Sequence, residues 1–151
     1  MCNNKGENCI AEILNVINIL QKNVCPDNCL DSCDKPVLGS GENCLICNTR
    51  PVMIYTCSGN GVPFSMPVGK DIITVCSTPN ELNRNMECSP VFRIEKIEGN
   101  CATFRVLKPN PEECSETRSK QPFIGTNSFF TFDIGCACAI KCLSDCYVEC
   151  I

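Results

Sequence analysis

The hydrophobic positions near the N-terminus repeat with the period of an α-helix. Residues 9–22 carry a stripe of aliphatic side chains at spacings of three and four, and polar residues lie off that stripe. The stripe consists of Ile10, Ile13, Leu14, Ile17 and Leu20. The pattern predicts an amphipathic helix whose apolar face packs either on its own domain or on a neighbouring subunit.

After residue 50 the pattern changes to short runs of β-branched and aromatic residues, which are typical of strands. The runs cover residues 51–57, 62–68, 71–76, 91–97, 101–107 and 128–134. A turn is expected at 58–61 and a polar surface loop at 108–122. Together the runs predict several short antiparallel strands.

The strongest local signal is a hairpin that joins residues 91–97 to residues 101–107. Its expected loop is Glu98-Gly99-Asn100, in which glycine and asparagine can take positive φ. In the second arm apolar residues alternate with Thr103 and Arg105, as in a strand with one buried face.

These elements predict a mainly β fold: a small antiparallel sandwich or barrel with an N-terminal amphipathic helix and Cys-rich termini. The expected organisation has five parts. They are a polar Cys-bearing arm (1–8), the helix (9–24), a Cys-rich irregular segment (25–50), a β-rich core domain (51–143) and a Cys-rich C-terminal tail (144–151).

Composition sets cysteine apart. The chain has 17 cysteines in 151 residues, above the roughly 8–10% that marks a disulfide scaffold. The number is odd, so at least one thiol is free or bonds to another chain. The N-terminus has no basic region of the kind that opens a secretory signal. Cysteine content therefore indicates an oxidising site, whereas the N-terminus indicates the cytosol.

Several function classes are not expected. The net charge is −4, without a basic block, which disfavours nucleic acid as a partner, and no apolar run approaches the length of a membrane span. The chain has no histidine, so no Cys–His or Ser–His pair can activate a nucleophile. We therefore expect no enzyme activity and no cofactor.

One alternative rests on the central cysteines. Cys44 and Cys47 form one CxxC, and Cys25, Cys29 and Cys33 lie four residues apart. Four thiolates can hold zinc without histidine, although a second CxxC pair is missing. A Cys-only zinc-binding protein is therefore one alternative. A secreted disulfide-rich binding module is the other; it rests on the total cysteine content and requires a leader removed upstream of Met1.

The terminal cysteines favour cross-linking. Cys138, Cys142, Cys146 and Cys150 are spaced by four, so in a helix or an extended segment they form a row. Cys2 and Cys9 bracket an arm that can extend about 23–25 Å. The candidates for intermolecular disulfides are Cys2, Cys9, Cys146 and Cys150. The candidates for either intra- or intermolecular disulfides are Cys25, Cys29, Cys33, Cys44, Cys47, Cys136, Cys138 and Cys142. Cys76 and Cys101, within predicted strands, are the ones most expected to be buried as small hydrophobes.

Three segments resemble one known family. Residues 48–65, 88–109 and 129–143, with the patterns FRIEKIEGNCATFRVL and DIGCACAIKCL, are similar to the spore coat and exosporium proteins CotY, CotZ and ExsY of spore-forming bacilli. The resemblance covers most of the chain. Its family-like cysteines are Cys101, Cys136, Cys138 and Cys142, whereas Cys57, Cys146 and Cys150 are additional to the pattern.

The resemblance implies a structural role without catalytic residues. It implies synthesis in the mother-cell cytoplasm and self-assembly, as hexamers, into two-dimensional sheets that disulfides harden at the spore surface. The implied partners are further copies of the chain and other coat or exosporium proteins. On this account the apparent conflict between cysteine content and compartment disappears, because oxidation accompanies assembly and mother-cell lysis.

Overall fold

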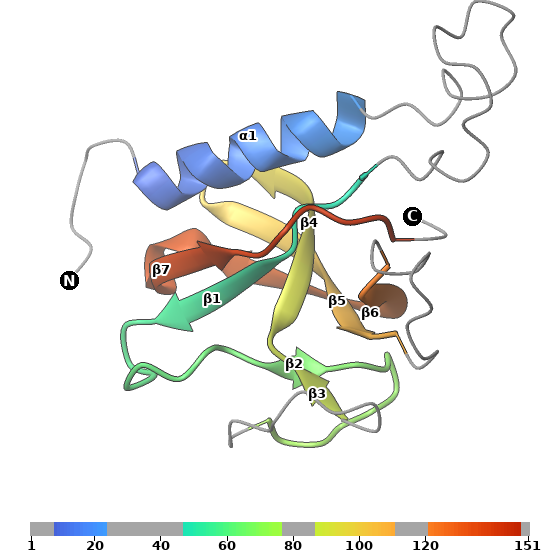
Figure 1. Ribbon diagram of the computed structural model, residues 1–151. Coiled ribbons are helices and arrows are strands. Elements are labelled where there is room, and N and C mark those ends of the chain that lie inside the picture. The colour runs from blue at the N-terminus through green and yellow to red at the C-terminus, as the bar shows by residue number, and fades with distance from the viewer. Residues whose placement is uncertain (1–7, 24–46, 77–86, 111–120, 149–151) are drawn as a thin grey trace, which may run out of the picture.

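The computed structural model describes residues 8–23, 47–76, 87–110 and 121–148 (Figure 1). It contains one helix, α1 (Cys9–Asn23), and a short 3₁₀ helix, η3 (Ile134–Cys136). The strands are β1 (Val52–Thr56), β2 (Met66–Pro67), β3 (Cys88–Ser89), β4 (Val91–Glu98), β5 (Cys101–Pro109), β6 (Phe123–Asp133) and β7 (Ala137–Cys142). The predicted class, mainly β with an N-terminal helix, is confirmed.

Five strands form one antiparallel sheet in the order β6-β5-β4-β1-β7. Within the described residues β6 and β7 have no second partner, so the sheet is open and does not close into a barrel. β2 and β3 form a separate two-stranded sheet, which Figure 1 shows at the end of the molecule away from α1.

The helix docks on its own domain through one narrow seam. Ile10, Leu14 and Ile17 are buried in the main core with residues of β1, β4, β5 and β6. At the end of this seam the Gln21 side-chain amide donates to the Ile94 carbonyl at 2.8 Å. The buried seam is narrower than the stripe predicted from sequence, because only the side chains that point at the sheet are covered.

Phenylalanines fill the core beneath the helix. Phe92, Phe104, Phe130 and Phe132 come from three adjacent strands, and Phe64 reaches the same cluster from the segment after β1. The Phe92 and Phe130 ring centroids are 4.8 Å apart in an edge-to-face arrangement, which aromatic pairs prefer. This packing follows from the alternation that the sequence predicted in β5.

The opposite face of the sheet carries a second apolar cluster. Val91, Leu107, Cys146 and Val148 are buried there, and the chain beyond β7 supplies the last two. The same face holds Glu95, which pairs with two arginines of β4 and β5, Arg93 at 3.0 Å and Arg105 at 2.9 Å. The C-terminal part of the described chain is therefore part of the domain.

Two local predictions are wrong. Residues 71–76 form no strand: Ile73 is 94% exposed and Val75 83%. Their β-branched side chains suit a strand, but no described strand lies beside them to pair with. The hairpin loop has two residues, not three, since β4 continues to Glu98, and only Gly99 takes positive φ (58°).

Candidate functional site: cysteines at the surface

Free thiols lie at the surface on several separate elements. The exposed free cysteines in the described part of the chain are Cys9, Cys47, Cys101, Cys136 and Cys142. Cys9 opens α1, Cys101 opens β5 and Cys142 closes β7. A molecule with thiols at these separate positions can form disulfides with more than one neighbour.

A disulfide joins the ends of β1 and β7. Cys57 is bonded to Cys138, with their Cα atoms 5.2 Å apart, and both residues are exposed. Between Tyr55 and Thr56 the pairing register of the two strands shifts, and β7 carries one extra residue, Cys138. This is a β-bulge. Beyond it the Cys57 amide donates to the Cys136 carbonyl at 3.3 Å, so Cys136 lies opposite Cys57.

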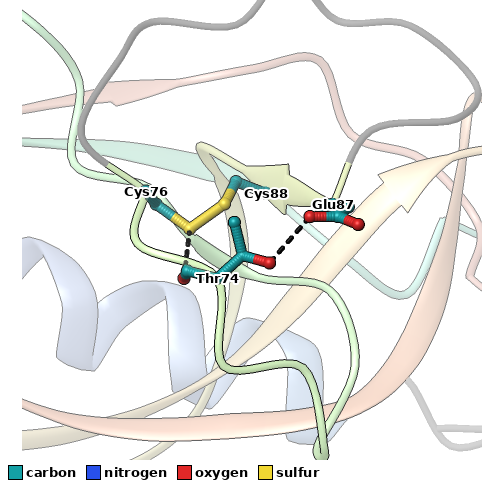
Figure 2. Close-up of a disulfide and its surroundings, with 4 residues drawn as sticks. All are labelled: Thr74, Cys76, Glu87 and Cys88. Carbon is teal, nitrogen blue, oxygen red and sulfur yellow. Dashed lines mark hydrogen bonds between the residues drawn. A yellow bond between two sulfur atoms is a disulfide. The ribbon is translucent and has the colours of Figure 1, made fainter.

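A second disulfide anchors the exposed segment that sequence assigned to a strand. Cys76 is bonded to Cys88, which is 3% exposed, at a Cα distance of 5.9 Å (Figure 2). Next to the bond the Thr74 hydroxyl donates to the Glu87 carboxylate at 2.7 Å, and the Cys76 Sγ lies 3.7 Å from the Thr74 carbonyl oxygen. This bond holds residues 71–76 against β3 without a strand ladder.

The expectation that Cys76 and Cys101 are buried small hydrophobes is wrong for both. Cys76 is half-buried and disulfide-bonded, and Cys101 is exposed at the first position of β5. The pairing of Cys76 with Cys88 was also missed. The available signal was the separation of 12 residues, which many other cysteine pairs in this chain resemble.

Cys146 is buried, although a terminal position favours an outward-facing thiol. Its side chain belongs to the second apolar cluster, and it is 2% exposed. Its amide donates to the Thr49 carbonyl at 2.9 Å, and its carbonyl accepts from the Thr49 amide at 3.1 Å. Burial raises the pKa of the thiol to about 11, with smaller contributions from the charges of Cys47 and Asp145. A bond from Cys146 to another chain, which stays a prediction, therefore requires this segment to leave the domain.

A surface ion pair holds the same segment. The Arg50 guanidinium donates two hydrogen bonds to the Asp145 carboxylate, at 2.6 and 2.8 Å. The hydrogen bond from Arg50 lowers the pKa of Asp145. Both residues line a pocket of about 200 Å³ between α1 and residues 47–50, in whose wall Cys47 also lies.

The outer side of α1 is apolar and uncovered in the described structure. Ile13, Val16, Ile19 and Leu20 are each 46–55% exposed. With Cys9, the positions 13, 16 and 20 follow the spacing of four, three and four that places side chains in one row along a helix. We call Ile13, Val16, Ile19 and Leu20 the outer face of α1.

Six of the predicted site cysteines lie outside the described residues: Cys2, Cys25, Cys29, Cys33, Cys44 and Cys150. Residues 8–23, 47–76, 87–110 and 121–148 contain no group of three or more His, Cys, Asp or Glu arranged to hold a metal ion. Of the five thiols on which the alternative zinc site rests, Cys47 is described and the other four are among the six, so that alternative is not tested. In the same described ranges no helix is long and apolar enough to span a membrane.

These features define a cysteine-rich β protein with internal disulfides and additional thiols at its surface. The family model described as spore coat protein Z matches residues 2–145. The chain belongs to the spore coat protein Z family, as the resemblance of its sequence motifs predicted. Comparison with curated proteins and comparison with solved structures each give no match. Family membership supports a structural rather than catalytic role in the coat, and location at the spore surface.

Proposed function

We propose that this protein self-assembles into a two-dimensional lattice of the spore's outer layer and that disulfides between subunits lock the lattice. The observation that carries the proposal is the set of exposed free thiols on separate elements: Cys9 on α1, Cys101 on β5 and Cys142 on β7. Contacts that extend beyond a closed ring must be made through more than one surface patch. Thiols on several elements meet that requirement.

Non-covalent contacts set the register before disulfides form. The outer face of α1 offers an apolar surface for such a contact, because its four aliphatic side chains are about half exposed. Removing apolar surface from water contributes roughly 25 cal/mol per Å², and association follows only where this exceeds the lost translational and rotational freedom. Once bonded, subunits no longer dissociate on dilution, so the persistence of the layer becomes kinetic.

The proposal places the protein in the coat crust or exosporium, after synthesis in the mother cell. The cytosol keeps thiols reduced, so the chain remains free of intermolecular disulfides until it reaches an oxidising surface. Hexagonal packing, as in the proteins that the sequence resembles, is the proposed arrangement. Other coat or exosporium proteins are its proposed further partners.

The test is electron microscopy of the purified full-length protein, together with gels run with and without reductant. We expect ordered sheets, and covalent ladders that collapse to monomer on reduction. Monomers under both conditions would refute self-assembly. Ladders without ordered sheets would support cross-linking and overturn the lattice. Elemental analysis of the same sample separates the alternative, since stoichiometric zinc would favour a metal-binding protein.

A further inference from the structure

Three cysteines meet where β1 ends beside β7. Cys57 is bonded to Cys138, and its amide donates to the carbonyl of Cys136. All three residues are exposed. The site therefore contains a solvent-accessible disulfide with a free thiol beside it.

Cys57 has a cysteine neighbour on each side of Ala137. Thr56 pairs with Ala137, the last pair of the ladder, and the bulged residue Cys138 follows Ala137 in β7. Before Ala137 lies Cys136, the last residue of η3, whose carbonyl accepts the hydrogen bond from the Cys57 amide, so that Cys136 lies opposite Cys57 as in a continuation of the ladder. Directly opposite residues have Cβ atoms about 4.5–5.5 Å apart, and a disulfide needs about 3.8 Å. A shift of about 1 Å would thus let Cys57 bond to Cys136 in place of Cys138.

We propose that Cys57, Cys136 and Cys138 form a thiol–disulfide exchange site that makes and corrects bonds between subunits. A thiolate of a second copy attacks the Cys57 Sγ. A new intermolecular disulfide forms, the Cys57–Cys138 bond breaks, and its electron pair leaves on the Cys138 Sγ, which takes up the proton that the incoming thiol released. One disulfide is lost and one is formed, so no oxidant is consumed.

Cys136 acts as the resolving thiol. Its thiolate attacks the Cys57 Sγ of the intermolecular bond, a Cys57–Cys136 bond forms, and the thiolate of the second copy leaves. A subunit bonded in the wrong register is released in this way, whereas one held by correct non-covalent contacts re-forms its bond. Exchange therefore supplies reversibility while the lattice is ordering. This inference rests on the proposed self-assembly.

Exchange and oxidation differ in how they change the number of free thiols. The experiment uses the full chain with the Cys57–Cys138 bond intact and its other exposed thiols reduced, in oxygen-free buffer. We expect covalent dimers to appear while the total number of free thiols stays constant. Oxidation would instead remove two thiols for each bond. Dimers that form only after oxygen is admitted, with that loss, would overturn the exchange site.

Matched variants locate the reaction. Cys57→Ser/Cys138→Ser removes the exposed disulfide and should abolish oxygen-free dimerisation. Cys76→Ser/Cys88→Ser removes the second disulfide of the described residues, whose Cys88 is buried, and should leave oxygen-free dimerisation unchanged. Equal dimer yields from both double variants would show that the bond to Cys57 is not the one attacked. Circular dichroism checks that both variants are folded.

Reduced glutathione serves as a probe that needs no assembly. In oxygen-free buffer it should form a mixed disulfide at Cys57. In Cys136→Ser the level of this adduct should rise above the wild-type level, by up to about twofold, because one of two resolving thiols is lost. Peptide mapping after alkylation should find both Cys57–Cys138 and Cys57–Cys136 bonds in the wild-type protein.

The two proposals fail separately. No adduct at Cys57 and no Cys57–Cys136 bond, in a protein that still forms sheets in air, would overturn exchange and leave the proposed function intact. An adduct at Cys57 in a protein that never forms sheets would overturn the proposed self-assembly and leave the exchange chemistry at Cys57 intact.

Discussion

The two sides of α1 can be compared by making the same substitution at positions two residues apart. Ile17 is 2% exposed and packs in the main core, whereas Ile19 is 49% exposed. Ile17→Ala removes a buried side chain and leaves a cavity, which lowers the free energy of unfolding by about 2–5 kcal/mol. That is a large fraction of the roughly 5–15 kcal/mol of a typical domain.

Ile19→Ala should change the stability of the monomer far less. Full burial of an isoleucine contributes about 1.5–3 kcal/mol, and half of this side chain already faces water. The expected loss is therefore about 1 kcal/mol, and the higher helix propensity of alanine offsets roughly half of it. The helix-propensity gain is the same at both sites, so the difference between the variants measures burial.

Association should respond in the opposite way. If a second copy covers the exposed half of Ile19, truncation removes about 1 kcal/mol for each Ile19 in the contact, so a contact that covers one Ile19 has an association constant roughly fivefold weaker. Without denaturant, the folded Ile17→Ala variant keeps the outer face of α1 intact, so it should associate as the wild type does.

Urea unfolding in the presence of reductant, followed by circular dichroism, measures the first effect. Sedimentation velocity of the reduced proteins measures the second. Equal unfolding midpoints for the two variants would refute the docking of α1 through Ile17. Unchanged association of the Ile19→Ala protein would remove the outer face of α1 from the lattice contact.

Three further predictions concern the interior. Gln21→Ala removes hydrogen bonds to one carbonyl of β4 and to one amide before β1, and should lower the free energy of unfolding by about 1–3 kcal/mol; a urea midpoint equal to wild type would contradict it. Glu95→Gln leaves two partly buried guanidiniums, of Arg93 and Arg105, without their counter-ion, and should cost about 3 kcal/mol, whereas a change below about 0.5 kcal/mol would assign the cluster no role in stability. The pKa of Cys146 is raised by burial to about 11 from 9.0, so its contribution to stability is complete below pH 9 and is lost as the pH rises toward 11; Cys146→Ala should flatten this decline in alkaline unfolding midpoints, and an equal decline in both proteins would contradict it.

Much of the fold could be predicted from local patterns. The helix and the hairpin of β4 and β5 lie where the hydrophobic periodicity placed them, because that periodicity follows directly from 3.6 residues per helical turn and two per strand repeat. The same reasoning failed for residues 71–76. β-branched residues favour extended backbone, but a strand also requires a partner, and that depends on distant parts of the chain.

The sequence predicted that cysteines form the candidate site, but not which cysteines lie together in it. A cysteine count far above structural need indicated cross-linking, and the structure adds which described thiols are accessible. The sequence assigned Cys138 to a row of tail thiols, whereas the β-bulge places it beside Cys57, 81 residues earlier. Disulfide partners that far apart in the chain leave no periodic signal.

Sequence alone determined the mainly β class, the amphipathic helix, the central hairpin and the family, since each depends on residues close together or on motifs in a fixed order. Tertiary structure decided which cysteines meet. The return of the chain past β7 buries Cys146 beside Thr49. The order of strands brings β1 against β7, so that Cys57 is bonded to Cys138 and its amide donates to the carbonyl of Cys136. The physical reason is that burial and disulfide bonding depend on spatial proximity, which the sheet order sets and local periodicity does not.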